Sequence, residues 1–342
     1  MKQLNIFLIL SIGIIMTMSC RNQDIEFPDY DYTTVYFPYQ FPVRTIVLGE
    51  DVYDNTLDNE HKCEIYASMG GVYSNKQKID IDITVENTLS DNLYYDSDFT
   101  QPVLAMPSNY YTLASNRISL DGTLQGGVEV QLSDAFFADP NAIRNTYVIP
   151  LRMTNVVNAD SILSGRPKAP EPIKVYAPDW DIQPKDFVLY SIKYINPWHA
   201  NYLRRGEDLI TEPDTSYTNV RRKEFVERDE VVKISTASMN SVEFPVTIVN
   251  TSDENQTCTL LLTFDEAGNC SISSLTNGFT ASGTGSFVKK GEKKSWGDKD
   301  RDAIYLDYTI DMGGKSYATK DTLVFRDRGV KMEVVAPFYK FN

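Results

Sequence analysis

The sequence predicts an all-β protein, and three observations carry that prediction. The 342 residues include 21 Tyr and 16 Phe, residue types that favour strands over helices. Short apolar runs alternate with polar residues along most of the chain, and turn residues separate them. The second half contains no amphipathic helical pattern of useful length. The length is sufficient for two domains of ordinary size.

The first twenty residues have the pattern of an export signal. Lys2 precedes an apolar run over 6–16, and small or modest residues lead to Cys20. The run is too short to cross a bilayer core of about 30 Å comfortably. We expect a lipoprotein signal peptide at 1–19, with Cys20 as the lipid-modified first residue and 20–29 as a tether. A plain signal peptide or a short anchor with an incidental cysteine is the alternative.

Residues 30–177 are predicted to form an immunoglobulin-like β-sandwich. The clearest strand is 78–85, where four apolar residues occupy one face and Asp80, Asp82 and Thr84 lie on the other. Asp121-Gly122 and Gly126-Gly127 mark turns. The remaining expected strands are 33–37, 44–48, 63–68, 117–120, 128–132 and 147–153. One short helix is expected at 134–142, and about seven short strands suit a two-sheet sandwich.

Residues 178–342 are predicted to form an antiparallel up-and-down β-barrel. Five prolines between 167 and 184 interrupt strand pairing, which places the boundary near 177. The segment 195–206 is interpreted as a loop that follows a strand. The expected strands are 187–195, 231–235, 242–249, 257–264, 270–275, 283–289, 303–312 and 316–325. Short hairpin joins between successive strands are typical of a barrel or a strongly curved meander.

Charge and motif content restrict the chemistry. The formal net charge of −14 disfavours nucleic-acid and anionic-membrane binding, which depend on Lys and Arg. His61 and His199 are the two histidines, and no HExxH, GxSxG or P-loop motif occurs. We therefore expect no enzyme and no cofactor. A glycoside hydrolase with two carboxylates stays open, because the chain has 47 acidic residues and none is singled out.

Three cysteines besides Cys20 are interpreted as buried thiols. An odd count argues against a disulfide framework in an exported protein. Cys258 and Cys270 are expected on two arms of one hairpin turning at 265–269. Symmetric pairing would place Cys270 opposite Phe264, so a disulfide between Cys258 and Cys270 is not expected.

Aromatic residues at strand ends are the candidate carbohydrate-binding residues. Sugar rings stack their C–H faces on indole, while their hydroxyls bind Asp, Asn and Arg. For any one tryptophan, capping the barrel core is the alternative. Trp180 is expected at the join between the domains. The full candidate set is Trp198, Trp296, Trp180, Tyr202, Asn196, His199 and Arg301.

A calcium loop is a weaker possibility at Asp298, Asp300 and Asp302. Alternate acidic residues resemble the start of a calcium-binding loop, but the glycine and distal Glu are missing. A solvated charged turn is the favoured interpretation, so we predict no metal.

Several stretches resemble a known pair of domains. Residues 110–113, 118–121, 126–132 and 147–153 are similar to an N-terminal domain of unknown function found in Bacteroidetes lipoproteins. Residues 194–206, 283–287, 295–299 and 321–328 are similar to its usual lipocalin-like C-terminal partner. The resemblance implies a polysaccharide-utilisation lipoprotein that captures carbohydrate at the outer membrane, beside a porin-and-lid transporter. Asp24 and Glu26 are compatible with export to the cell surface.

Together these observations favour a non-enzymatic, cell-surface glycan-binding lipoprotein whose partner is a polysaccharide or oligosaccharide. The alternatives are a structural lipoprotein that docks onto an outer-membrane transporter complex, and a cryptic glycoside hydrolase.

Overall fold

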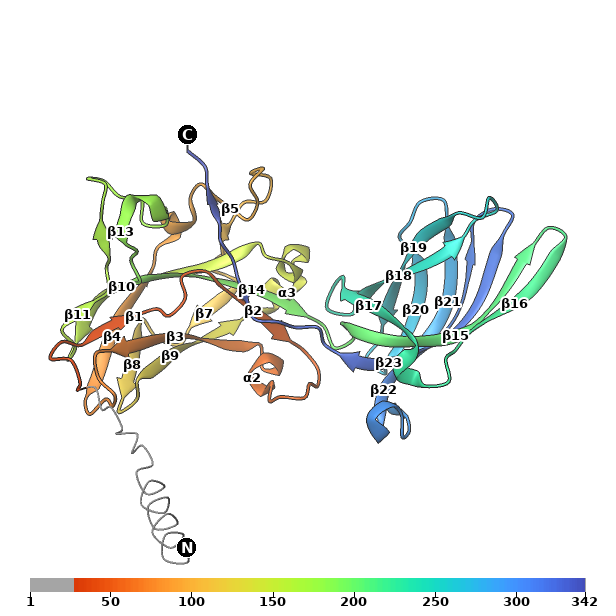
Figure 1. The fold of residues 1–342 in the computed structure, drawn as a ribbon, viewed down its shortest axis with the longest axis horizontal. Coiled ribbons are helices and arrows are strands. Elements are labelled where there is room, and N and C mark those ends of the chain that lie inside the picture. The colour runs from red at the N-terminus through yellow and green to blue at the C-terminus, as the bar shows by residue number, and fades with distance from the viewer. Residues whose placement is uncertain (1–27, 342) are drawn as a thin grey trace, which may run out of the picture.

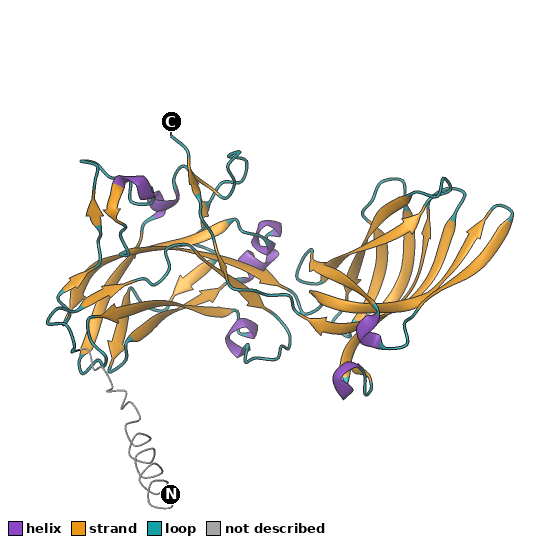
Figure 2. Cartoon of the chain, viewed as in Figure 1, coloured by secondary structure: helices purple, strands orange, loops and turns teal. Residues whose placement is uncertain are grey.

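The computed structural model describes residues 28–341 and shows two β-rich domains joined end to end (Figure 1). Helices are few and short in both domains (Figure 2). The expected signal peptide at 1–19, Cys20 and most of the tether at 20–29 lie outside the described residues. Within the described part, no helix has the length and apolar character needed to cross a membrane.

The N-terminal domain is the expected sandwich of two curled sheets. One sheet has the order β11-β1-β3-β9-β7, and the other has the order β24-β2-β14-β10-β4-β8, with β6 added on β10. The strands of the first sheet are β1 (Thr34–Tyr36), β3 (Lys62–Gly70), β7 (Tyr111–Leu113), β9 (Gln125–Leu132) and β11 (Ser161–Ile162). Those of the second are β2 (Pro42–Val47), β4 (Lys78–Val85), β6 (Leu104–Ala105), β8 (Arg117–Asp121), β10 (Tyr147–Val157), β14 (Phe187–Ile195) and β24 (Glu333–Val334).

The sandwich core confirms the alternation seen in the sequence. Ile79, Ile81 and Ile83 of β4 are buried, while the polar residues between them face outward. The expected helix at 134–142 is present as two short pieces, α3 (Asp134–Ala138) and the 3₁₀ turn η2 (Pro140–Ile143). Pro140 begins the second piece, since a proline cannot continue the first helix.

Small elements complete this domain. They are α2 (Thr56–Asn59), η1 (Asn87–Ser90), β5 (Leu93–Tyr94), β12 (Arg166–Pro167), η3 (Ala177–Asp179), β13 (Trp180–Ile182) and β25 (Phe338–Tyr339). The C-terminal segment returns from the barrel, because β24 pairs with β2 and β25 pairs with β5.

Strand pairing places the boundary between the two domains later in the chain than the sequence predicts. The segment 187–195 was expected to open the barrel, but β14 lies inside the sandwich, antiparallel to β10 and parallel to β2. Its side chains are buried on both faces, as a central strand requires. The expected boundary at 177/178 therefore precedes the last central strand of the sandwich, and residues 333–339 belong with the sandwich as well.

The C-terminal domain is the expected closed antiparallel barrel. Its strands follow in the order β15-β17-β18-β19-β20-β21-β22-β23, and pairing of β15 with β23 closes it. They are β15 (Ala200–Glu212), β17 (Glu230–Thr236), β18 (Ser241–Val249), β19 (Asn255–Phe264), β20 (Asn269–Ser274), β21 (Thr280–Glu292), β22 (Arg301–Asp311) and β23 (Ser316–Asp327). β16 (Thr215–Arg221) extends the sheet beside β15, and η4 (Val226–Arg228) and η5 (Trp296–Asp298) lie in connections.

The prediction of a loop over 195–206 is wrong, because β15 begins at Ala200. Its inward residues include Ala200, Tyr202 and Ile210, but also Arg204 and Asp208. Charged residues on the inner face hide the apolar alternation by which a strand is recognised.

Candidate ligand-binding site in the barrel

A hollow of about 370 Å³ occupies the end of the barrel away from the sandwich. β17 pairs with β15 only from Ala200 to Arg204, and β16 pairs with β15 from Gly206 to Glu212. The wall between β16 and β18 therefore has no strand pairing, and the hollow extends between these two strands. Its polar lining comes from Arg204, Asp208, Thr218, Asn219, Arg221, Thr247, Asp253, Lys315 and Thr319.

Asp321 is the buried centre of a charged network beneath this hollow. Its Oδ2 accepts hydrogen bonds from Arg204 Nε at 3.0 Å and from the Tyr308 hydroxyl at 2.8 Å. Its Oδ1 accepts from Arg221 Nη2 at 2.8 Å. A carboxylate taken out of water is tolerated only when such partners satisfy it. Burial and the charge of Asp321 raise the pKa of Tyr308, which keeps this hydroxyl a donor.

Asp208 is the second carboxylate that binds Arg221. Arg221 donates to Asp208 through Nε and Nη2, both at 2.8 Å, and Thr319 donates at 2.9 Å. Burial would raise the pKa of Asp208, but the hydrogen bond and charge of Arg221 outweigh it and hold the pKa below the ordinary 3.8. The two carboxylates likewise raise the pKa of Arg221 against the effect of burial.

Gly206 makes room for this network. It lies opposite Arg221 on one side and opposite Asp321 on the other. An added Cβ would lie 2.6 Å from Asp321 Oδ1 and 2.2 Å from the Lys320 carbonyl oxygen. Any larger residue here would therefore displace the carboxylate that the arginines hold.

Tyrosines and a lysine form the outer part of the hollow. The Tyr317 hydroxyl donates to the Val249 carbonyl at 2.7 Å, and Lys315 pairs with Glu212 at 2.8 Å. Tyr217 is 46% exposed, and its hydroxyl has no such bond to any described residue. Arg221 Nη1 has no acceptor in the part of the chain that the structure describes. The hollow thus combines aromatic rings with planar charged groups whose positions are fixed.

Trp198 lies just before β15, at the end of the barrel that faces the sandwich. Its ring lies parallel to that of Phe264, with centroids 4.2 Å apart, and it packs against the barrel core. One face of the indole is therefore covered. Its Nε1 is buried and has no hydrogen-bond partner within residues 28–341.

Two neighbouring candidates, Tyr202 and Asn196, also make structural contacts. Tyr202 is fully buried and donates to the Trp198 carbonyl. Asn196 is also fully buried: its amide donates to the carbonyls of Ser238 and Ser241, and its Oδ1 accepts from the backbone N–H groups of Trp198 and His199. These contacts fix the turn from β14 into β15.

Trp296 lies in the connection between β21 and β22, next to Arg301, the first residue of β22. The guanidinium carbon of Arg301 is 3.5 Å from the centroid of the Trp296 ring, and Trp296 Nε1 donates to the Phe325 carbonyl. Here too one indole face is covered. Asp300 of the same connection accepts from the Lys294 N–H, and Asp302 of β22 accepts from the Lys290 N–H of β21. The described residues contain no group of three side chains suited to a metal ion.

Trp180 lies far from the barrel rather than at the join between the domains. It begins β13, which is at the opposite end of the sandwich (Figure 1). Trp180 Nε1 donates to the Ile173 carbonyl, and the Lys174 ammonium is 5.5 Å from the centroid of its ring. The seven candidates thus do not form one surface, and none lines the hollow of the barrel.

The cysteine register agrees with the sequence expectation. Cys270 pairs with Phe264, and Cys63, Cys258 and Cys270 are free and buried. Sequence reasoning missed the charged residues of the hollow. A signal was present in the sequence, because Arg204 and Asp208 are separated from the apolar residues at 202 and 210 by even intervals. This spacing places two charged residues on the buried face of a strand.

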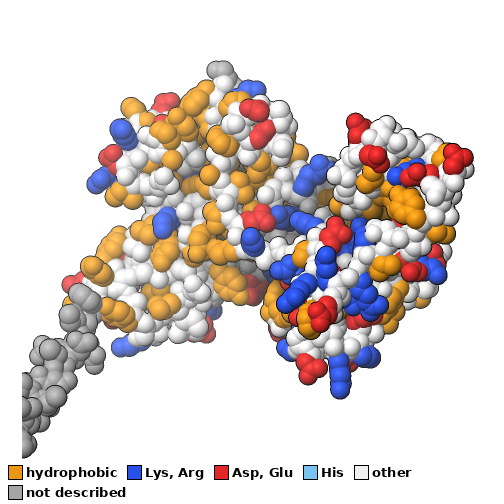
Figure 3. All heavy atoms as spheres, turned by 45° about the vertical axis from the view of Figure 1, so that its right-hand side comes forward, with side chains coloured by type: hydrophobic (Ala, Val, Ile, Leu, Met, Phe, Trp, Pro, Cys, Tyr) orange, Lys and Arg blue, Asp and Glu red, His pale blue; other side chains and the backbone are white. Residues whose placement is uncertain are grey.

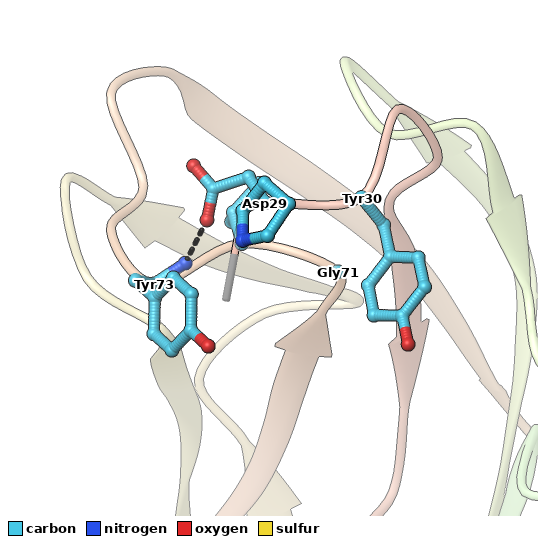
Figure 4. A pocket seen from close by; sticks show the side chains of 6 residues that line it. Asp29, Tyr30, Gly71 and Tyr73 are labelled. Carbon is cyan, nitrogen blue, oxygen red and sulfur yellow. Dashed lines mark hydrogen bonds between the residues drawn. The ribbon is translucent and has the colours of Figure 1, made fainter. Parts of the chain in front are cut away.

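Another hollow, of about 470 Å³, lies on the sandwich near the first described residues. Tyr30 and Tyr73 flank Gly71, and Asp29 accepts from the Tyr73 N–H at 2.7 Å (Figure 4). Both tyrosines are mostly exposed, and among the described residues of the lining only Asp29 is charged. This hollow lacks the fixed set of polar groups that the barrel provides.

Comparisons with known proteins agree with this two-domain architecture. Residues 197–329 match a family described as a domain of unknown function, DUF5627, and residues 30–160 match a family described only as an N-terminal domain. No curated protein matches the chain significantly. One crystal structure, of a candidate carbohydrate-binding protein from Bacteroides ovatus, is 12% identical over 88% of this chain and 98% of its own. Its TM-score of 0.28 is too low for any inference about this chain.

The informative relative is a crystal structure from Bacteroides ovatus of a protein of unknown function. It is 49% identical over 91% of this chain and 100% of its own, with a TM-score of 0.87. Identity and coverage of this extent establish common descent. The chain therefore belongs to the same family as this Bacteroides ovatus protein of unknown function, and its barrel is the part that matches DUF5627.

Proposed function

We propose that this protein is a non-enzymatic glycan-binding protein that takes a short saccharide segment into the open end of its barrel. The observation that carries the proposal is the hollow of about 370 Å³ in which Arg221, Asp208 and Asn219 lie beside tyrosine rings. Its volume is within the range typical of small-ligand sites, about 300–1,000 Å³. Sugar hydroxyls suit planar charged groups and amides, and the apolar face of a sugar packs on an aromatic ring.

The ionisation of the network supports binding rather than hydrolysis. A glycosidase needs one carboxyl group with a raised pKa to act as general acid. Asp208 has the opposite shift, because Arg221 stabilises its charged form. Asp208 and Asp321 also share Arg221 Nη2, so both are held as acceptors.

The proposal retains the lipid anchor and the outer-membrane location inferred from residues 1–29 and from the resemblance. A tethered binding protein needs only modest affinity for one saccharide segment, since many copies on one cell bind a polymer multivalently. Incorporation of labelled fatty acid that disappears in Cys20→Ala would support the anchor, and persistence of the label in that variant would contradict it.

The direct test is binding by the purified chain without residues 1–19 to a panel of glycans, measured by affinity electrophoresis and calorimetry. Tyr217→Ala removes an exposed ring from the barrel hollow, and we expect at least a tenfold loss of affinity. Tyr73→Ala is the matched control, because it removes an exposed ring from the sandwich hollow. Equal binding by Tyr217→Ala and the parent protein would reject the barrel site, and absence of binding to every glycan would favour docking to a transporter complex.

A further inference from the structure

A separate cleft of about 280 Å³ lies where the two domains meet. The sandwich contributes Lys193 from β14 and Thr45 from β2, while the barrel contributes Lys233 and Ser235 from β17 and His199 from the turn before β15. Lys and Arg side chains gather near this junction in the space-filling view (Figure 3). The cleft shares no lining residue with the barrel hollow.

The positive charge of this cleft exceeds the negative charge that faces it. Lys193 and Lys233 line it, and Glu333 is the one carboxylate among its lining residues. Arg328 lies behind the cleft wall with only 5% exposure, and carbonyl oxygens of Leu48, Asn196 and Pro197 accept its hydrogen bonds. Among the described residues, these carbonyls are its acceptors and no carboxylate forms an ion pair with it. An excess of cations is notable in a chain with a net charge of −14, because most of its surface repels anions.

His199 adds a neutral donor at the same place. Its Nδ1 accepts from the Thr236 backbone N–H at 3.0 Å, which leaves the ring proton on Nε2. Burial, followed by the charges of Lys233, Arg328 and Lys193, lowers the pKa of His199 to about 4. The positive charges of these three side chains disfavour protonation of the His199 ring, so the imidazole stays neutral near pH 7.

Glu333 shows which chemistry the cleft accepts. Both of its carboxylate oxygens accept from Lys193 Nζ at 2.9 Å. Its backbone is held separately, by pairing with Val43 of β2. Lys233 is exposed and has no ion pair among the described residues, and the Ser235 hydroxyl has no hydrogen bond there either. A carboxylate of the chain therefore occupies one part of the cationic cleft, and donors remain in the rest.

We propose that the interdomain cleft is a second binding site, which takes a small oxyanion on Lys233, Lys193 and the Nε2–H of His199. The oxyanion is a free sulfate or phosphate, or the carboxylate or sulfate of an acidic saccharide, because these groups offer the same acceptor oxygens. Glu333 competes with this ligand for Lys193. The site is independent of the saccharide site in the barrel.

The test uses the chain without residues 1–19, labelled at histidine, in NMR titrations at constant ionic strength. With only two histidines, His61 serves as the internal reference for His199. Sodium sulfate, potassium phosphate and sodium glucuronate are the oxyanion arms, and sodium chloride and glucose are the controls. We expect saturable shifts of the His199 signals with an oxyanion and none with chloride or glucose, while the His61 signals stay in place.

Variants separate a built site from general charge attraction. Lys233→Gln is expected to weaken binding about fivefold, and Glu333→Gln to strengthen it by a similar factor, because it removes the competing carboxylate. Lys320→Gln, an exposed lysine on the outer wall of the barrel, is expected to bind as the parent protein does. Saturation by glucuronate alone would identify an acidic saccharide as the ligand, and saturation by sulfate or phosphate would identify the free anion as sufficient. Shifts that grow without saturation, or that are equal in Lys233→Gln and Lys320→Gln, would overturn the proposal.

Discussion

The indole ring of Trp198 lies flat on the phenyl ring of Phe264, with 4.2 Å between the ring centroids and 7° between the planes. Trp198 precedes β15 and Phe264 ends β19, so the stacked pair closes the barrel at the end that faces the sandwich. An aromatic ring covered on one face by another ring contributes to the core. This relationship shows that a tryptophan that the sequence places at a strand end has one face packed on the barrel core.

Trp198→Ala is therefore expected to reduce stability rather than ligand affinity. Loss of the half-buried indole should lower the free energy of unfolding by about 2 kcal/mol or more, because it leaves a cavity beside Phe264. Urea unfolding measures this change, and calorimetry on the folded protein measures affinity. A tenfold loss of glycan affinity with unchanged stability would contradict this role.

Asp208 should make the stability of the barrel depend on acid pH. Its pKa is lowered in the folded state, so the unfolded chain binds a proton more readily than the folded chain. The stabilising contribution is complete above the ordinary value of 3.8 and is lost as the pH falls through the lower folded value. Asp208→Asn should be less stable at pH 7, and the difference from the parent protein should shrink toward pH 2.

The measurement is the urea midpoint of both proteins at several pH values between 7 and 2. Other carboxylates titrate in the same window, so the quantity that matters is the difference between the parent protein and the variant. A difference that stays constant over this range would show that the charge of Asp208 makes no contribution.

His199 should titrate far below an ordinary histidine. Burial and the nearby cations lower its pKa from 6.5 to about 4. The unfolded chain therefore binds a proton between these values while the folded chain does not, and stability falls as the pH decreases from 6.5 toward 4. An NMR titration of the His199 ring should have its midpoint near 4. His199→Gln should lose this part of the pH dependence, and a His199 midpoint near 6.5 would contradict the described burial.

Arg328 should fix the orientation of the two domains. It follows β23 of the barrel and donates to the Leu48 carbonyl of the sandwich at 3.0 Å and to the Asn196 carbonyl at 2.7 Å. Arg328→Met removes these donors and leaves the Leu48 carbonyl without its donor, while the Asn196 carbonyl keeps the His199 N–H; the cost is on the order of 1–3 kcal/mol. We expect a broader distribution of shapes in small-angle X-ray scattering and faster proteolysis near residues 195–200.

Arg326→Gln is the control for this experiment. Arg326 is 47% exposed, and its one ion pair among the described residues is with its neighbour Asp327, so its replacement should change neither property. Identical scattering by Arg328→Met and the parent protein would show that the strand pairing of β24 with β2 is enough to orient the domains.

The fold was largely predictable because most strands place apolar residues on one face. β4 and β14 match their expected ranges, and the hairpin turn at 265–269 predicts the pairing of Cys270 with Phe264. The alternation in β4, the nearly continuous apolar run of β14 and the length of the turn are all visible in the sequence. The candidate site was not predictable in the same way. Arg204 and Asp208 face inward on β15 and mask the pattern that identifies a strand.

The sequence by itself determined the all-β class, the two-domain order and the register of neighbouring hairpins, because these follow from contacts between residues close along the chain. Only the tertiary structure decided that β14 pairs with β2 in the sandwich and that Asp321 meets Arg204 and Arg221 inside the barrel. It also decided that Trp198 lies on Phe264. The physical reason is that pairing between distant strands, and the balance of buried charges, depend on which side chains the closed barrel brings together. The spacing of residues along the sequence does not show which side chains meet when the barrel closes.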